Sequence, residues 1–339
     1  MRWSKIRGRG RPASSRGREV EALAKPRVAV VCGGPSAEAE VSRVSARGVA
    51  EALRKAGHEV VVLELDPSVA TRLQEAEVDV VFPVLHGPPG EDGCFQGLLE
   101  ILGLPYVGSG VLGSACAMDK VVAKRLFRAA GLPVAREVVI QPHEAPAEAA
   151  ARVRAELGER VVVKPARQGS AVGVGFGEGG LEEAIAQAQR FGDPVLVEER
   201  IEGKEITVAV LEREDRVEAL PVIEIRTPPE SWYDYQHRYT PGWSEHVIPA
   251  PLPEATYART QEVACRAHQV LQCRDFSRAD FVVPERGEPI LLEVNTIPGM
   301  TPTSLFPDAA QAAGISFEEL VAHLVGRALA RAKSRPSPA

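Results

Sequence analysis

Short apolar runs alternate with segments of helical periodicity along the first hundred residues. The runs at 27–34, 58–66 and 78–87 are apolar over the length of a strand and predict buried strands. Between the first two, apolar positions recur at helical spacing, which predicts a helix over 38–57. Strands that alternate with helices predict a parallel sheet covered on both faces. Such sheets bind ligands at the carboxyl ends of their strands, and the His86-Gly87 pair lies at one of these ends.

The pattern predicts two further units after residue 118. In the first, Asp119 opens a helix that Gly131 closes, a second helix covers about 146–157, and two strands flank the Gly- and Ser-containing loop within 160–176. In the second, a long helix around 254–271 accompanies strands near 216–225, 275–284 and 288–294. The expected divisions of the chain are a tail at 1–26, an N-terminal α/β domain at 27–118, a central subdomain at 119–202 and a C-terminal subdomain at 203–339.

Composition limits the class of protein further. Of the 339 residues, 45% are hydrophobic and 25% are charged, which is ordinary for a water-soluble globular protein. No run approaches the roughly 18 unbroken apolar residues of a membrane helix, so we expect no membrane insertion. The five cysteines are odd in number and form no C-x-x-C pair. They argue against a disulfide framework and a structural zinc site and fit a reducing compartment, which favours the cytoplasm.

Charge is distributed unevenly. The formal net charge is −6, but residues 1–25 carry eight Lys or Arg against two Glu, which leaves the rest of the chain near −12. The leading segment lacks the apolar core of a secretory signal, and we interpret it as a basic, disordered tail. Weak contact with nucleic acid or a membrane surface is the alternative interpretation.

Oxygen-bearing side chains are expected to converge on two neighbouring strands. Arg278 and Asp280 share one face of a strand, as Glu293 and Asn295 do on the next. The Pro, Gly and charged residues between them predict a hairpin, so the strands would be antiparallel neighbours. Carboxylate and amide oxygens without Cys or His suit magnesium, which completes its shell with waters and substrate phosphates. An ion-paired surface hairpin built on Arg278 explains the charges, but it does not explain Asn295 or the Pro298-Gly299 turn.

Weaker signals lie between residues 160 and 205. Lys164 ends an apolar strand just before the Gly-Ser loop, an arrangement that can bind phosphate, although the sequence G-x-x-x-x-G-K-[ST] is absent. Glu198 and Glu199 end one strand, and Glu205 starts the next after a turn at Gly203. Taken alone, these carboxylates favour solvated charges at a hairpin.

Several motifs occur in one fixed order along residues 27–330. They are "VLHGPPGEDGCFQG", "GLPYVGSG", "AMDK", "VVVKPARQGSAVGV", "YDYQHRY" and "LLEVNTIPGMTPTSL". In these motifs the chain resembles the D-alanine–D-alanine ligases, which are members of the ATP-grasp superfamily. The resemblance implies an α/β fold, α+β in parts, with an N-terminal Rossmann-like parallel-sheet domain followed by a two-subdomain ATP-grasp fold. The general ATP-grasp pattern alone would also fit biotin carboxylase-like and glutathione synthetase-like enzymes.

The resemblance assigns roles to individual residues. It implies that Asp280, Glu293 and Asn295 bind magnesium, that Lys120 and Lys164 contact the phosphates of ATP, that Glu198 and Ile201 meet adenine, and that Glu205 meets the ribose. It assigns the ammonium of the first D-alanine to Glu38, with His86 close by, and the pocket of the second D-alanine to Arg278, Gly299, Ser304 and Leu305. Ser170 and Tyr239 match loop residues that bridge to Glu38 and close the site, and Arg238 precedes that tyrosine near the nucleotide.

The implied activity is ATP-dependent ligation of two D-alanines through an acyl phosphate, for peptidoglycan precursors. The implied partners are ATP, two magnesium ions or manganese in their place, D-alanine and a second copy of the chain, with no nucleic acid. Clustered cations suit the anionic states of such a reaction. The aromatic, Pro-rich stretch 226–243 would cover the site, because an acyl phosphate hydrolyses when water enters.

Four positions depart from the family pattern. Gln168 replaces an acid and Ala171 replaces a serine in the Gly-Ser loop. Arg238 stands where a lysine is usual, and Arg200 stands where an aromatic residue is common. These departures bear on ATP affinity more than on the type of reaction.

Three alternatives remain, one of them a ligase and two of them proteins of other classes. A ligase that uses D-lactate or D-serine as acceptor is the nearest, and Tyr239 favours an amine acceptor over it. A nucleotide-binding module without activity would not need the complete set of Glu38, Asp280, Glu293 and Asn295. A dinucleotide-binding reductase is disfavoured, because Pro35 follows Gly33-Gly34 and no G-x-G-x-x-G occurs.

Overall fold

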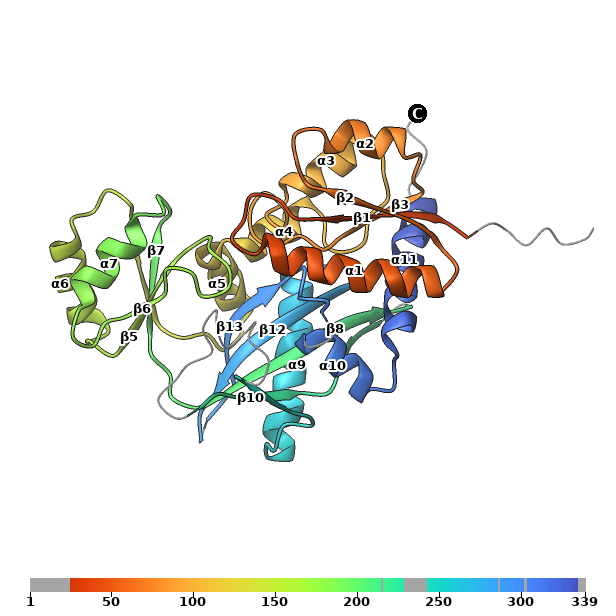
Figure 1. The fold of residues 1–339 in the computed structure, drawn as a ribbon. Coiled ribbons are helices and arrows are strands. Elements are labelled where there is room, and N and C mark those ends of the chain that lie inside the picture. Colours follow the sequence, from red (N-terminus) through yellow and green to blue (C-terminus); the bar gives the residue numbers. More distant parts are fainter. Residues whose placement is uncertain (1–24, 215, 229–242, 286, 302–303, 335–339) are drawn as a thin grey trace, which may run out of the picture.

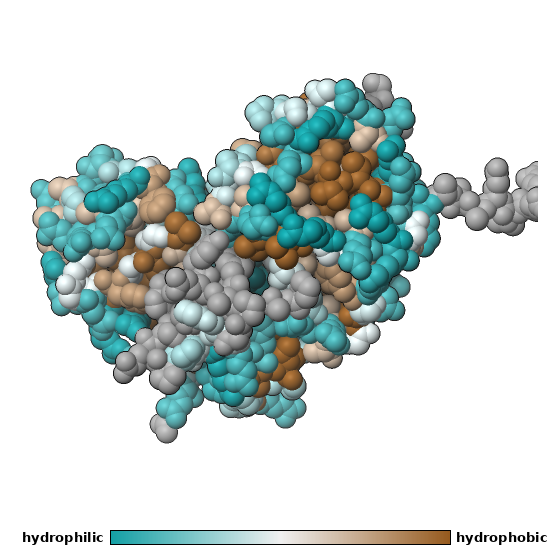
Figure 2. Space-filling model, viewed as in Figure 1, coloured by the Kyte–Doolittle hydropathy of each residue, from teal (hydrophilic) through white to brown (hydrophobic). Residues whose placement is uncertain are grey.

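Three sheets, each with its own helices, follow one another along the chain (Figure 1). A computed structural model describes residues 25–214, 216–228, 243–285, 287–301 and 304–334. Within these ranges no helix is long and apolar enough to cross a membrane. Figure 2 shows hydrophilic residues over most of one face of the molecule, with a hydrophobic area over the first sheet.

The first sheet is parallel, with strand order β2-β1-β3. Its strands are β1 (Arg27–Cys32), β2 (Glu59–Glu64) and β3 (Val80–Pro83). The helices of this part are α1 (Ala39–Lys55), α2 (Val69–Glu75), α3 (Cys94–Leu102) and α4 (Val111–Met118). Alternate residues of β1 enter different cores, since Val28 packs with α1 whereas Ala29 packs with α2 and α3. The predicted strands, the first helix and the parallel sheet covered on both faces are confirmed.

The second sheet is antiparallel, with strand order β4-β7-β5-β6. Its strands are β4 (Glu137–Ile140), β5 (Val161–Pro165), β6 (Gly175–Phe176) and β7 (Val195–Glu199). The helices α6 (Pro146–Glu156) and α7 (Leu181–Gln189) pack on one face. The helix α5 (Lys120–Ala129) begins as predicted, because the Asp119 carboxylate accepts hydrogen bonds from the N–H groups of Val121 and Val122.

The third sheet is also antiparallel, with strand order β11-β10-β8-β12-β13 and β9 beside β8. Its strands are β8 (Lys204–Arg213), β9 (Arg216–Ala219), β10 (Ile223–Arg226), β11 (Glu245–Val247), β12 (Phe276–Val283) and β13 (Ile290–Asn295). The helix α9 (Glu254–Val270) covers one face, and α10 (Leu305–Ala312) and α11 (Phe317–Lys333) lie on the other. The predicted region 216–225 holds two strands, since Pro221, which has no N–H to donate, lies between them.

One sequence interpretation is wrong. Glu198 and Glu205 do not flank a hairpin, because β7 pairs with β4 and β5 whereas β8 pairs with β9, β10 and β12. The segment around Gly203 instead carries the chain from the second sheet to the third. It passes so close to the backbone that a Cβ on Gly203 would lie 2.3 Å from the carbonyl oxygen of Val283. Hence Gly203, although exposed, is a point of close backbone approach in the link between two sheets and not the tip of a hairpin.

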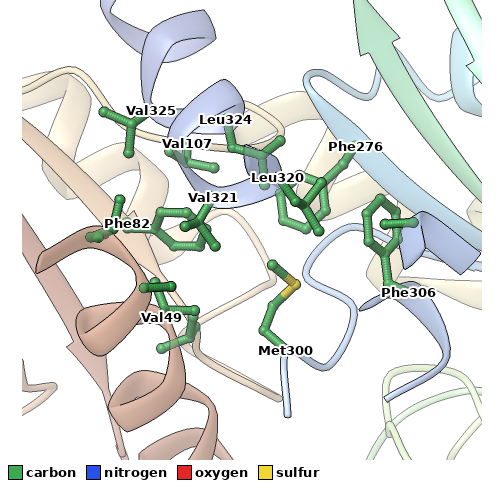
Figure 3. Packing of buried hydrophobic residues seen from close by; sticks show 14 of the residues in the cluster. Val49, Phe82, Val107, Phe276, Met300, Phe306, Leu320, Val321, Leu324 and Val325 are labelled. Atoms are coloured by element: carbon green, nitrogen blue, oxygen red, sulfur yellow. The ribbon is translucent and has the colours of Figure 1, made fainter. Parts of the chain in front are cut away.

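The first and third sheets share one hydrophobic core (Figure 3). Phe82 of β3 and Val49 of α1 join Leu320 of α11 in this core. Phe276 of β12 contacts Phe306 of α10 edge to face, with ring centroids 5.4 Å apart. These contacts hold the carboxyl ends of β1 and β3 in a fixed relation to β12. The second sheet has a separate core of its own, formed with α6 and α7. The division of the chain at residues 118/119 and 202/203 stays a prediction.

Candidate active site

The two strands that carry the predicted metal ligands are paired as the sequence predicts. On β12 and β13, Arg278 lies opposite Asn295 and Asp280 lies opposite Glu293 in antiparallel register. A bulge follows Asp280, where the register shifts by one residue. This pairing places a guanidinium, two carboxylates and an amide on adjacent positions of one sheet.

Asp280 is held by several donors. The Nε and Nη2 of Arg278 donate to its two carboxylate oxygens at 2.8 and 2.7 Å, and Asn295 Nδ2 donates at 3.1 Å. The hydroxyl of Thr207 on β8 donates to the same carboxylate at 2.6 Å. Because Arg278 and Asp280 are both largely buried, this pair is a fixed element of the site and not an exposed surface hairpin.

Lys120 connects this group to the Gly-Ser loop. Its Nζ lies 3.3 Å from Glu293 Oε2 and donates to the carbonyl oxygen of Gln168 at 2.7 Å. Lys120 is the first residue of α5, and its position follows from the Asp119 cap. The Gln168 side chain, a departure from the family pattern, lies 3.4 Å from Asp193, whereas its backbone makes the contact with the lysine.

A cavity of about 550 Å³ lies between the second and third sheets. Polar side chains from both sheets line it, and apolar side chains supply the rest of the wall. The charged lining residues are Lys120, Lys164, Arg200, Glu202, Glu205 and Glu293. The volume falls within the usual range for small-molecule sites. The cavity is therefore lined by five residues that the family resemblance assigns to ATP or its metal: Lys120, Lys164, Ile201, Glu205 and Glu293.

Glu198 lies behind the cavity wall, where it pairs with two lysines. Its side chain is 2% exposed, it forms an ion pair with the fully buried Lys124, and it accepts from Lys164 Nζ at 2.6 Å. Burial raises the pKa of Glu198, but the two ammonium groups outweigh that effect and lower the pKa from 4.5 to about 2. The sequence reasoning missed Lys124, although the spacing K-x-x-x-K from Lys120 puts it one turn further along α5.

Glu38 and the Gly-Ser loop meet at the carboxyl end of the first sheet. Ser170 Oγ donates to Glu38 Oε1 across 132 positions of the chain. Ser170 and Ala171 both have positive φ, +46° and +59°, which turns the loop toward α1. A Cβ on Gly169 would lie 3.3 Å from Glu38 Oε2, so glycine allows this close approach. The predicted bridge from the loop to Glu38 is present in the described residues.

The motif "HGPPGEDG" contributes the buried His86 and the partly buried Glu91 beside Glu38. Glu91 accepts a hydrogen bond from the N–H of Gly87 at 2.9 Å. Burial, aided by the charge of Glu38, raises the pKa of Glu91 to about 8. Burial lowers the pKa of His86, against the attraction of Glu38. Sequence reasoning placed His86 here but missed Glu91, which the same motif contains.

The turn after Asn295 leads to the start of α10. A Cβ on Gly299 would lie 2.8 Å from Ser304 Oγ, so only glycine leaves room for that hydroxyl. Ser304 Oγ accepts from the N–H of Thr301 at 3.1 Å, and Leu305 is the first residue of α10. Gly299, Ser304 and Leu305 thus form a compact turn at a helix start. Tyr239 and Arg238 lie outside the described residues.

The chain matches models of two families. Residues 126–326 match the family described as "D-ala D-ala ligase C-terminus", and residues 68–109 match "D-ala D-ala ligase N-terminus". A D-alanine–D-alanine ligase of Halalkalibacterium halodurans is 47% identical over 306 residues, which cover 89% of this chain and 99% of that protein. One from Desulforudis audaxviator is 49% identical over 303 residues, covering 88% and 97%.

Solved structures agree with these relatives. A D-alanine–D-alanine ligase of Bacillus anthracis superposes with a TM-score of 0.79 at 31% identity, covering 91% of this chain and 99% of that one. Another structure of the Bacillus anthracis ligase, complexed with ATP, gives a TM-score of 0.77 at 29% identity over the same shares. The likeness confirms the predicted fold of a Rossmann-like sheet followed by an ATP-grasp unit.

Proposed function

The chain belongs to the D-alanine–D-alanine ligase family, and from that premise we propose that it joins two D-alanines at the expense of ATP. The product would be D-alanyl-D-alanine, with ADP and phosphate released, for peptidoglycan precursor synthesis. One observation carries the proposal: two pockets adjoin at Lys120 and Glu293, which line both of them. The larger pocket also holds Lys164, and the smaller one holds Asn295 and Gly169, whose loop contacts Glu38. Groups that suit a triphosphate and groups that suit an amino acid therefore adjoin.

Charge determines how the cavity would receive ATP. Lys120 and Lys164 present two ammonium groups to its interior, where the negative charge of a triphosphate would lie. Glu205 lines the same cavity and would accept hydrogen bonds from ribose hydroxyls. Lys164 is fixed by Glu198 behind it, so its ammonium is pre-positioned for the phosphates.

The residues around Asp280 fit a divalent cation of the magnesium type. They offer carboxylate and amide oxygens only, and Asp280, Glu293 and Asn295 lie on paired strands. Two carboxylates and one amide leave positions of the coordination shell that substrate phosphates and water would complete. When bound, magnesium or manganese would neutralise charge that develops on the transferring phosphoryl group.

The amino-acid side of the reaction uses the first sheet and the β12–β13 pair. Glu38 would hold the ammonium of the first D-alanine, whose carboxylate attacks the γ-phosphorus of ATP to give an acyl phosphate and ADP. The amine of the second D-alanine then attacks the acyl carbon, and phosphate leaves. Arg278 would stabilise the oxyanion of that step or bind the second carboxylate. Gly299, Ser304 and Leu305 would line the second pocket, where the helix start favours an anion.

Two residues of the stretch 226–243 extend this proposal. Tyr239 would close the site over Glu38 and Ser170, and Arg238 would lie over the nucleotide. Together they would exclude water from the acyl phosphate. We further propose a homodimer in the cytoplasm, from the family resemblance. D-alanine is favoured over D-lactate or D-serine as acceptor, since Tyr239 of the motif "YDYQHRY" favours an amine acceptor and the relatives are named D-alanine–D-alanine ligases.

Substitution of one carboxylate tests the proposal. Glu293→Gln removes the charge beside Lys120 while keeping the size of the side chain, and we expect turnover with ATP and D-alanine to fall at least 100-fold. Glu288→Gln, a matched change at an exposed position between the same two strands, should leave turnover unchanged. Thermal unfolding of both variants establishes that they fold. Near-normal turnover of Glu293→Gln would refute the assignment.

A further inference from the structure

A histidine and an aspartate that the sequence reasoning did not single out join β11 to α10. His246 lies on β11, which is an edge strand of the third sheet, and Asp308 lies in the first turn of α10. His246 Nδ1 is 2.6 Å from Asp308 Oδ2, and the two side chains are 17% and 25% exposed. Because a carboxylate only accepts hydrogen bonds, the Nδ1 of His246 carries the proton and donates. This largely buried contact fixes the carboxylate of Asp308 toward β11.

Other contacts hold the backbone on both sides of this hydrogen bond. Ile225 of β10 lies opposite His246 in antiparallel register, and it belongs to the same hydrophobic core as Phe306 of α10. The N–H of Asp308 donates to the carbonyl oxygen of Ser304 at 3.1 Å. A change of the His246 side chain therefore acts on the direction of the Asp308 side chain more than on the path of either backbone.

The N-terminus of α10 offers backbone donors to an anion. The first N–H groups of a helix have no partner within that helix, and Pro307 has no N–H, which leaves two such groups, on Leu305 and Phe306. Ser304 precedes the helix without capping it through its side chain, and its Oγ instead accepts from the N–H of Thr301. These donors and the positive end of the helix lie where the proposed function puts the carboxylate of the second D-alanine.

A carboxylate in the first turn of a helix competes with a bound anion for these donors. Helical side chains lean toward the N-terminus of their helix, and a negative charge is favourable there. Without its hydrogen bond to β11, Asp308 would bring its carboxylate toward the N–H groups that the acceptor needs. We propose that His246 is a positioning residue, which holds the Asp308 carboxylate away from these groups and keeps them for the carboxylate of the second D-alanine. This role rests on the proposed function.

Separate constants for the two D-alanines test this role. Initial rates of phosphate release by the full chain are measured over a range of D-alanine concentrations with ATP and magnesium, and they are fitted with one KM for each D-alanine. His246→Ala is expected to raise the KM for the second D-alanine about threefold to tenfold, because the Asp308 carboxylate is released. The KM for the first D-alanine and the KM for ATP should change less than about twofold.

Two further variants separate the direction of the carboxylate from the contact itself. In His246→Ala combined with Asp308→Ala, no carboxylate is left to compete, so the KM for the second D-alanine should return to within about twofold of the wild-type value. His246→Asn keeps an N–H donor near the position of Nδ1 and should also stay within about twofold. Asp308→Ala alone should leave this KM at or below the wild-type value.

Controls make the outcome decisive. His143→Ala removes an exposed histidine between β4 and α6 and should leave all three constants unchanged. Unfolding midpoints measured without ligand establish that the variants fold. An unchanged KM for the second D-alanine in His246→Ala, equal increases for both D-alanines, no recovery in the double variant, or a raised constant in Asp308→Ala would each overturn the inference. If the wild-type chain releases no phosphate in response to D-alanine, the proposed function fails, and this inference fails with it.

Discussion

The buried carboxylate of Glu198 makes a sharp prediction about stability and pH. Glu198 is 2% exposed and pairs with Lys124 and Lys164, and its pKa in the folded chain is about 2, compared with 4.5 for an ordinary glutamate. Since the folded state binds the proton more weakly than the unfolded state, the carboxylate stabilises the fold above pH 4.5. That contribution is lost as the pH falls from 4.5 toward 2. The shift of about 2.5 pH units corresponds to roughly 3 kcal/mol.

Glu198→Gln removes this pH-dependent contribution. The free energy of unfolding of the wild-type chain should fall between pH 7 and pH 3.5, and Glu198 should account for roughly 1 to 2 kcal/mol of that fall. The variant also leaves Lys124 without its carboxylate, so it should be less stable at pH 7 by about 3 to 5 kcal/mol.

Urea unfolding at a series of pH values measures both effects. Glu212, whose pKa is also lowered to about 2, contributes in the same pH window, so the difference between variant and wild type is the relevant quantity. If the stability of Glu198→Gln depends on pH in the same way as that of the wild type, the lowered pKa of Glu198 in the folded chain is refuted. A variant of unchanged stability at pH 7 would refute the buried ion pairs.

Two further predictions concern the contacts between the sheets. Ser170→Ala removes the hydrogen bond to Glu38. The KM for D-alanine should therefore rise up to about tenfold in steady-state kinetics, while the KM for ATP changes little. Equal changes in both KM values would contradict the role of this hydrogen bond. Asp275 is fully buried, accepts from the N–H of Gly108 at 2.8 Å and pairs with Arg331. Asp275→Asn should therefore lower the free energy of unfolding, measured with urea, by about 3 to 5 kcal/mol. Glu262→Gln, which breaks an exposed ion pair, should lower it by less than about 1 kcal/mol. Equal losses in the two variants would contradict the role of burial.

Much of the fold could be predicted because the signals were local. The valine-rich strands of the first sheet, the Asp119 cap and the β12–β13 pair with Asp280 opposite Glu293 each depend on a few consecutive residues. The helix α11 was missed, although Ser316 and Glu319 form a capping box at its start.

The interior of the site was harder to predict, because it depends on contacts far apart in sequence. Glu198 and Glu205 sit seven positions apart but in different sheets, which no local pattern distinguishes from a hairpin. The ion pair of Lys124 with Glu198 and the raised pKa of Glu91 arise only when α5 and the "HGPPGEDG" turn pack against other elements. Sequence motifs therefore identified the site residues that the structure brings together. The residues that support them from behind could be identified only in the structure.

The most direct test of the central claim is the reaction itself. The purified full chain is incubated with ATP, magnesium and D-alanine, phosphate release is followed over time, and the product is identified by mass. We predict release that depends on D-alanine and a product with the mass of D-alanyl-D-alanine, with little product when D-lactate or D-serine is offered as the second substrate. A folded chain that releases no phosphate in response to D-alanine would contradict the account.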